Sequence, residues 1–142
     1  MLPKTHFILT LLLSLILYAL SFATPLQAAI ILAAGVLIDV DHWLIYAIKR
    51  KDLSIRKAYK WFYGFNERKE HKRFLYIFHT FESFLIILLI GLKFTIFLWV
   101  FLGMAFHLLM DFIEAIKLKH YGKYPSIILR IMKTSKGESI LG

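Results

Sequence analysis

The sequence predicts an all-α integral membrane protein, a bundle of four transmembrane helices arranged as two tight hairpins. The first observation behind this prediction is four apolar stretches, each near the roughly 20 residues that cross a bilayer. The second is composition, because 59% of the 142 residues are hydrophobic and only 19% are charged. The third is that basic residues flank the apolar stretches instead of lining a soluble surface. These observations exclude most soluble folds, and they argue against nucleic acid as a partner despite a formal net charge of +9.

The predicted transmembrane helices cover residues 6–23, 26–48, 74–92 and 94–116. Neighbouring stretches must fold back on each other, because a continuous helix of about 43 residues would span roughly 65 Å, twice the hydrocarbon core. Helix breakers stand where turns are required, at Thr24-Pro25 and at Gly91-Leu92-Lys93. The first stretch also resembles a signal peptide. Its apolar part of roughly 17 residues exceeds the usual length of about 7 to 15, which favours a retained span.

Positive charge predicts the orientation of the helices. The loop 49–73 carries ten Lys or Arg and the tail 117–142 carries six, whereas the hairpin tips carry only Lys93. The positive-inside rule therefore places both termini and the loop in the cytoplasm, with the protein in the cell (inner) membrane. The loop interleaves aromatic with basic side chains, which is typical of an amphipathic helix in the headgroup layer and predicts anionic lipid headgroups as partners. Residues 126–133 of the tail predict a second short interfacial helix.

Ionisable residues inside the apolar stretches predict a functional site, because a charged group in hydrocarbon costs several kcal/mol unless it is paired, hydrated or metal-bound. Three predicted helices each present one His and one carboxylate at helical spacing, namely Asp39 with His42, His79 with Glu82, and His107 with Asp111. At a rise of about 1.5 Å per residue, all three pairs lie roughly 7 to 14 Å from the cytoplasmic boundary. The sequence therefore predicts that they converge in one layer.

Imidazoles and carboxylates at one depth form a nitrogen and oxygen donor set suited to zinc, manganese or iron. The chain has no Cys, which excludes thiolate ligands. The number of donors exceeds the need of one tetrahedral zinc, so one ion and a dinuclear centre both stay open. Asp41 points about 160° away from Asp39 on an ideal helix, so it needs local unwinding to join the site. Gly35 and Gly103 each precede a predicted ligand by four residues, where a missing side chain would let helices approach.

Three motifs, Asp-x-Asp-His at residues 39–42, His-Thr at 79–80 and His-x-x-x-Asp at 107–111, resemble those of the small multi-pass membrane-bound metal-dependent hydrolases of bacteria and archaea. This resemblance covers roughly residues 35–114 and implies metal ligands at Asp39, Asp41, His42, His79, His107 and Asp111. The last motif is also distantly similar to those of the zinc phospholipase C and P1 nuclease enzymes, which implies a phosphoester substrate. The chain departs from the family pattern around His79, since His71 lies further upstream than expected and Glu82 follows closely.

The expected function is metal-dependent hydrolysis of a lipid-like, phosphoester-containing substrate at the cytoplasmic leaflet. Zinc is the favoured ion, and Glu82 or Asp41 is expected to handle the proton. Two alternatives stay open at this point, a non-catalytic metal-binding or structural membrane protein and a helical di-iron redox enzyme. A metal or proton carrier is disfavoured, because the outer halves of the first, second and fourth predicted spans are apolar and provide no evident path across the membrane.

Overall fold

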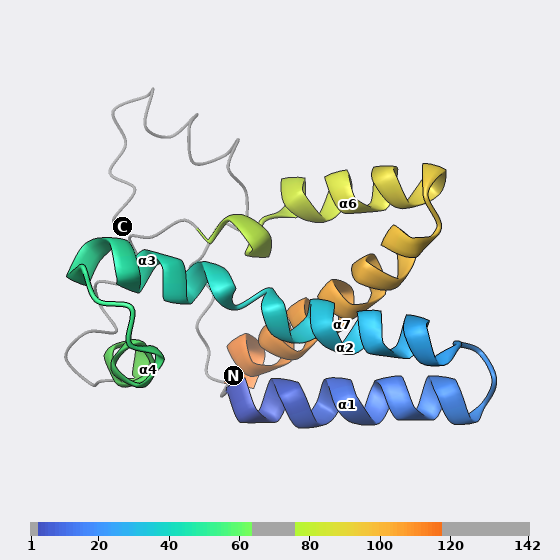
Figure 1. Cartoon of the computed structure of the whole chain (residues 1–142), viewed down its shortest axis with the longest axis horizontal. Helices are drawn as coiled ribbons and strands as arrows, with labels where there is room; N and C mark the ends of the chain where they lie inside the picture. The colour runs from blue at the N-terminus through green and yellow to red at the C-terminus, as the bar shows by residue number, and fades with distance from the viewer. Residues whose placement is uncertain (1–2, 64–75, 118–142) are drawn as a thin grey trace. The chain divides into compact units, whose positions relative to one another are not determined.

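The computed structural model describes residues 3–63 and 76–117, and every element in these ranges is helical (Figure 1). The elements are α1 (Pro3–Ala19), α2 (Pro25–Leu37), α3 (Val40–Arg50), α4 (Ile55–Tyr63), a 3-10 helix η1 (Ile77–His79), α6 (Phe81–Lys93) and α7 (Ile96–Lys117). The all-α prediction is confirmed for this part of the chain. The described residues form two compact units, one containing α1, α2, α7 and α6 from Glu82 onward, the other running from Asp39 to Phe81. His71, His120 and the predicted tail helix lie outside the described residues.

Helices α1 and α2 form the first predicted hairpin and pack against each other (Figure 1). Helix α2 begins with a capping box, in which the Thr24 hydroxyl accepts a hydrogen bond from the Gln27 backbone at 3.3 Å. In return, the Thr24 backbone N–H donates to Gln27 Oε1 at 2.7 Å. Pro25 occupies the first turn, where its missing N–H costs nothing. The turn predicted at Thr24-Pro25 is therefore confirmed, and the capping box at Thr24 fixes where α2 begins.

Two glycines set the distance between α2 and α7. A Cβ atom added to Gly103 would lie 2.4 Å from the carbonyl oxygen of Ile31 and 3.1 Å from the backbone nitrogen of Gly35. A Cβ atom added to Gly35 would lie 2.7 Å from the Cγ2 of Thr10 on α1. The three helices thus meet where side chains are smallest, as is typical of helices that pack in a membrane. The predicted role of Gly35 and Gly103 in close helix approach is confirmed.

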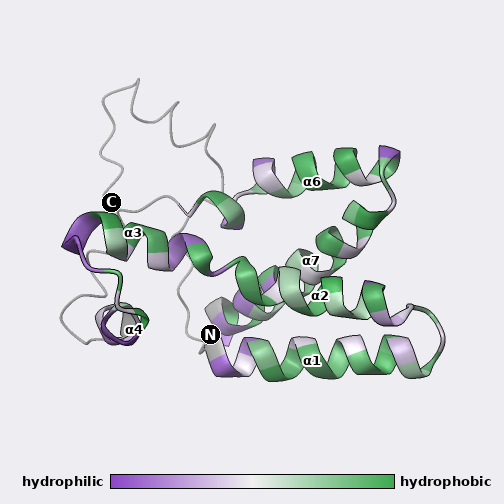
Figure 2. Ribbon diagram, in the orientation of Figure 1, coloured by the Kyte–Doolittle hydropathy of each residue, from purple (hydrophilic) through white to green (hydrophobic). Residues whose placement is uncertain are grey.

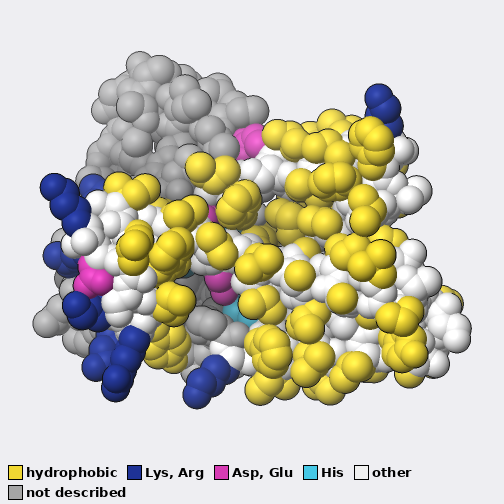
Figure 3. All heavy atoms as spheres, in the orientation of Figure 1, with side chains coloured by type: hydrophobic (Ala, Val, Ile, Leu, Met, Phe, Trp, Pro, Cys, Tyr) yellow, Lys and Arg dark blue, Asp and Glu magenta, His cyan; other side chains and the backbone are white. Residues whose placement is uncertain are grey.

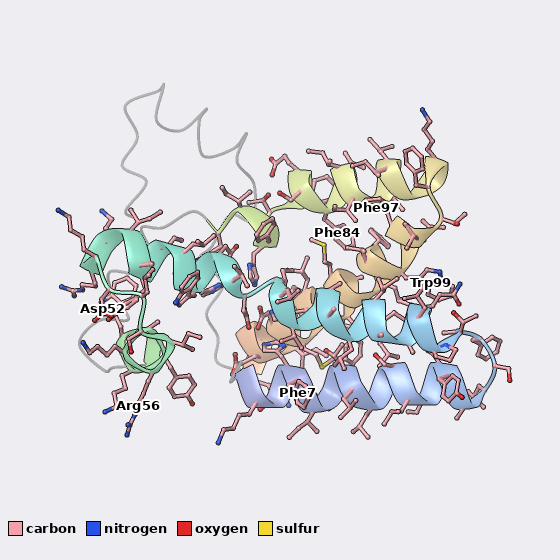
Figure 4. The ribbon with its side chains drawn as sticks, in the orientation of Figure 1. Phe7, Asp52, Arg56, Phe84, Phe97 and Trp99 are labelled. Carbon is pink, nitrogen blue, oxygen red and sulfur yellow. The ribbon has the colours of Figure 1, made fainter. Side chains whose placement is uncertain are left out.

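Helix α1 buries its polar side and exposes its apolar side. His6, Thr10 and Ser14 lie one helical turn apart and are 2%, 1% and 3% exposed. Large apolar side chains of the same helix, including Phe7, Leu12 and Ile16, are about half exposed. Figure 2 shows the hydrophobic colouring along α1 and α2, and Figure 4 shows Phe7 on α1. This distribution is the reverse of that in a soluble helical bundle.

Helices α6 and α7 form the second hairpin. Helix α6 ends at Lys93 and α7 begins at Ile96, so the tight turn predicted in this region is confirmed. A Cβ atom on Gly91 would lie 2.8 Å from Leu98 Cδ2, which shows how closely the chain returns on itself. Further along the hairpin, the rings of Phe84 and Phe101 lie 4.2 Å apart, and Figure 4 shows Phe84 on the α7 side of its helix.

The second unit has a small aromatic core between α3 and α4. Tyr46, Ala58 and Trp61 are at most 5% exposed and form one cluster. The Trp43 Nε1 donates a hydrogen bond to the Leu53 carbonyl oxygen at 3.1 Å, which fixes the turn between the two helices. Helix α4 confirms the amphipathic helix predicted in the basic loop over residues 55–63, while residues 64–73 of that loop lie outside the described part.

Two of the predicted spans are interrupted. The span predicted over residues 26–48 breaks between α2 and α3, at Ile38 and Asp39. In the span predicted over 74–92, η1 is separated from α6 by Thr80, whose backbone is extended at φ −95° and ψ 150°. A continuous helix through this second region is therefore wrong for the described residues. His79 and Glu82 consequently do not share one helical face.

Candidate metal centre

The interruption at Asp39 brings two carboxylates to one imidazole. Ile38 closes α2 by donating its N–H to the Ala34 carbonyl oxygen at 3.2 Å, and α3 begins at Val40. Asp39 occupies the N-cap position of α3, but its side chain makes no capping hydrogen bond. Its Oδ1 lies 3.7 Å from the Nδ1 of His42. The local unwinding that Asp41 needs in order to join Asp39 is thus present.

Four predicted ligands of the second unit meet in one group, here named the Asp-His cluster: Asp39, Asp41, His42 and His79. The two oxygens of Asp41 lie 2.7 Å from His42 Nδ1 and 3.1 Å from His79 Nδ1. The Asp39 Oδ1 lies 3.4 Å from His79 Nε2. Asp41, His42 and His79 each offer a donor atom, and these atoms lie within 4.8 Å of one another. The structure therefore joins segments that are 38 residues apart in the sequence.

Hydrogen bonding indicates where the imidazole protons are. An ionised carboxylate only accepts hydrogen bonds, so His42 and His79 each donate an Nδ1 proton to Asp41. The backbone N–H of Phe78 donates to the same carboxylate at 3.1 Å. In neutral imidazoles this arrangement leaves the lone pair on Nε2. The lone pair of His79 Nε2 then faces a carboxylate oxygen of Asp39, and a cation between them would satisfy both groups.

Aromatic packing holds the orientation of these imidazoles. The ring of Tyr76 stacks on His42 with centroids 3.9 Å apart and planes 10° from parallel. The rings of His42 and His79 meet edge to face at 4.7 Å. Thr80 follows His79 and donates its hydroxyl to the Ile77 carbonyl oxygen at 2.8 Å, which closes η1. The 3-10 turn, rather than a regular helix, therefore sets the direction of the His79 side chain.

The other two predicted ligands, His107 and Asp111, belong to the first unit. His107 is fully buried, and its Nδ1 donates a hydrogen bond to the Gly35 carbonyl oxygen at 2.7 Å. Its Nε2 lies 3.4 Å from Asp111 Oδ2. The other oxygen of this carboxylate, Oδ1, lies 3.1 Å from the Nε2 of His6. The predicted pairing of His107 with Asp111 at helical spacing is therefore present.

Sequence reasoning assigned no ligand role to His6, which was placed simply at the end of a span. The signal that could have found it was the alternating direction of the helices. Helix α1 begins near the end where α2 and α7 finish, so His6 belongs to the same level of the first unit as Asp111 (Figure 1). A second signal was the spacing of His6, Thr10 and Ser14 at four-residue intervals in an apolar stretch.

Glu82 lies in the first turn of α6 and is half-buried. It belongs to the first unit, whereas His79, with which it was paired from the sequence, belongs to the Asp-His cluster. Its role as a base stays a prediction. The same holds for the predicted convergence of His42, His79 and His107 on one ion, because the structure groups the first two in the second unit and the third in the first.

The donors of the Asp-His cluster fit a divalent metal. Two imidazoles and two carboxylates supply nitrogen and oxygen ligands of the kind that zinc, manganese and iron accept. The contact of Asp41 with both Nδ1 atoms is the carboxylate–histidine arrangement that orients metal-binding imidazoles. Comparison of the chain with protein families, with curated proteins and with solved structures finds no match.

Proposed function

We propose that the chain is a membrane-embedded, metal-dependent hydrolase that acts on a lipid-like phosphoester at the cytoplasmic leaflet. The observation that carries this proposal is the Asp-His cluster, a set of oriented metal donors in an unusually apolar helical chain. The resemblance of its motifs to those of small membrane-bound metal-dependent hydrolases supports the choice of reaction.

Membrane insertion is supported by length, composition and exposure. Two helical stretches, Pro25–Arg50 and Ile96–Glu114, are long and apolar enough to cross a membrane. Only 22% and 17% of their most apolar windows are buried, unlike the core helix of a soluble protein. Figure 3 shows many apolar side chains on the visible surface of α1 and α2. In a membrane these side chains would contact lipid. With α1 and α6 completing the two hairpins, we propose four membrane-inserted segments.

The basic surface of the second unit supports a cytoplasmic, lipid-facing orientation. Lys and Arg side chains gather around the end of α3 and on α4, beside the exposed apolar Ile55 and Tyr59 (Figure 3). Such a surface attracts anionic headgroups and buries apolar side chains at the membrane interface. It would also hold the phosphate of a substrate, because Lys and Arg make charge-assisted hydrogen bonds to phosphate oxygens. We therefore place the loop and both termini in the cytoplasm.

The residues of the Asp-His cluster have separable roles in this proposal. Asp41 orients both imidazoles through their Nδ1 protons. The proposed ligands are Asp39 Oδ1 and His79 Nε2, which lie 3.4 Å apart, together with His42. When bound, a divalent ion polarises a phosphoryl oxygen and makes a water molecule more acidic. The proton acceptor that this reaction needs is a carboxylate outside the ligand set, the role predicted for Glu82 or Asp41.

The test uses the full chain in detergent and in vesicles, purified through a tag without histidine and loaded with Zn²⁺ or Mn²⁺. Release of phosphate or headgroup is measured from a panel of phospholipids and lipid-linked phosphates. Asp39→Asn should lower hydrolysis by more than about 100-fold, beyond the effect of losing a group that only orients a ligand. Asp52→Asn is the matched control, because Asp52 is a surface carboxylate bound to Lys57 and should keep full activity.

A non-catalytic metal site is the second candidate. It is favoured by the Asp41 contacts, which tie α3 to the segment of Phe78 and His79 across more than 35 residues. A metal there would stabilise the fold without substrate. Folded, metal-loaded wild-type protein that hydrolyses no member of the panel would contradict the hydrolase and support this candidate. Hydrolysis that disappears in Asp39→Asn would exclude a purely structural role.

A further inference from the structure

We propose that His6, His107 and Asp111 form a metal site of their own in the first unit, so that α1 supplies a ligand. This group is here named the His6 site. All three residues belong to the unit that contains α1, α2, α7 and α6 from Glu82 onward. The proposal does not depend on hydrolysis, since it concerns binding of a divalent ion alone.

The two imidazoles of the His6 site both contact the carboxylate of Asp111. Their rings stack with centroids 3.8 Å apart and planes 11° from parallel. Each Nε2 faces a different oxygen of Asp111, at 3.1 Å for His6 and 3.4 Å for His107. Donor atoms of the three residues all lie within 4.8 Å of one another. Two imidazoles and one carboxylate are the donor count of catalytic zinc sites that keep one position for water or substrate.

The tautomer of His107 calls for a cation at this place. Its Nδ1 carries a proton, because the Gly35 carbonyl oxygen that it contacts at 2.7 Å can only accept. In the neutral ring, Nε2 then has only a lone pair, and this lone pair faces a negatively charged oxygen. A second proton on His107 would also satisfy this contact, at the cost of one charged and fully buried ring, while neutral His6 donates from Nε2 to Asp111. A divalent ion would satisfy both Nε2 atoms and the carboxylate once one of the stacked rings turns its lone pair toward it.

Burial indicates that the site is built into the helix interface. His6 is 2% exposed and His107 is fully buried, and the Nδ1 of His6 makes no hydrogen bond within the described part of the chain. The backbone carbonyl at His107 Nδ1 also matches the outer hydrogen bond that metal-binding histidines usually make.

A thiol placed at position 6 gives a direct test, because the chain has no other Cys. The His6→Cys variant of the full chain is purified in detergent, stripped with a chelator and titrated with Co²⁺. Thiolate and imidazole both bind this class of ion, so the variant should gain a thiolate-to-Co²⁺ absorption in the near ultraviolet. Ser14→Cys is the matched control, since it lies on the same buried side of α1 two turns away and should show no such band.

Metal counting provides the second measurement. His6→Gln in a background of Asp39→Asn and His79→Ala should lose the Co²⁺ that the background variant still binds. Its helical circular dichroism should stay unchanged. A folded His6→Cys variant without the absorption band would overturn the proposal, as would equal Co²⁺ binding with and without His6. If either Cys variant fails to fold, the metal count of His6→Gln decides. Neither result depends on hydrolysis, so failure of the His6 site can be distinguished from failure of the proposed hydrolase function.

Discussion

The Nδ1 of His107 donates a hydrogen bond to the carbonyl oxygen of Gly35 at 2.7 Å, across the interface between α2 and α7. This contact depends on the absence of side chains at Gly35 and Gly103, because a Cβ atom on Gly103 would lie 2.4 Å from the backbone oxygen of Ile31. The second unit repeats the principle at His79, whose Nδ1 is held by Asp41 and whose Nε2 faces Asp39. In His107 and in His79 alike, Nδ1 is held by a hydrogen bond and Nε2 faces a carboxylate oxygen.

Replacement of Gly103 tests the close approach of α2 and α7. Gly103→Ala should destabilise the protein by about 1–3 kcal/mol, because the added methyl group meets backbone and the helices must separate. Thermal unfolding in detergent, followed by circular dichroism, measures the change. Ala33→Leu on the exposed side of α2 is the control and should leave unfolding nearly unchanged. Equal stability of Gly103→Ala and wild type would mean that the two helices do not meet at this residue.

Substitutions at Asp41 and Asp39 distinguish the residue that orients the ligands, Asp41, from the residue that binds the ion, Asp39. Asp41→Asn should weaken zinc binding by about 10- to 100-fold, because two imidazoles lose an acceptor for their Nδ1 protons. Asp39→Asn should have the larger effect, since its oxygen faces His79 Nε2 directly. Competition with a chromophoric chelator measures both affinities. The opposite order would make Asp41 the ligand and Asp39 the orienting group.

Single cysteines in this Cys-free chain test the orientation. Lys57→Cys on α4 and Lys93→Cys at the end of α6 should react with a membrane-impermeant thiol reagent from opposite sides of sealed inner-membrane vesicles. Lysed vesicles provide the control for reactivity of each thiol. Labelling of both positions from the same side would contradict the proposed four-segment topology, including the cytoplasmic placement of the basic loop.

Acid should weaken the turn that begins α4. The ammonium of Lys57, at 2.8 Å, and the Ser54 N–H, at 2.9 Å, hold the pKa of Asp52 below its usual value. The folded turn therefore binds the ionised carboxylate more strongly than the unfolded chain does. This stabilisation is complete above about pH 4, the ordinary aspartate pKa, and is lost as the pH falls through the lower folded pKa. NMR titration of the Ser54 and Lys57 amides measures the pKa of Asp52 in the folded protein, with Asp52→Asn as the control. An Asp52 that titrates at its ordinary pKa in the wild-type protein would contradict the contact.

The sequence predicted the elements whose signals are local. The helical class followed from apolar stretches, the first turn from Thr24-Pro25, and the close helix approach from the four-residue spacing of Gly35 to Asp39 and of Gly103 to His107. These features depend on propensity, capping and side-chain size, which the sequence states directly. They appear in the structure where the sequence places them.

The sequence could not predict the features that depend on tertiary contacts. Hydropathy favours a continuous helix through His79, but the hydrogen bonds of Asp41 to the Phe78 N–H and to the His79 ring accompany a 3-10 turn there. The contribution of His6 was missed for a related reason. Its partners lie about 100 residues away on α7, so no local spacing connects them.

The zinc content of the full chain tests the central claim that the Asp-His cluster binds a metal. Wild-type protein and the double variant Asp39→Asn, His79→Ala are purified without a histidine tag, stripped, reloaded with Zn²⁺ and dialysed, and the zinc-to-chain ratio is measured by elemental analysis. The account predicts that wild type retains zinc and that the double variant, with unchanged helicity, loses the share bound at the cluster. Equal ratios in the two proteins, or a folded wild type that retains no zinc, would contradict it.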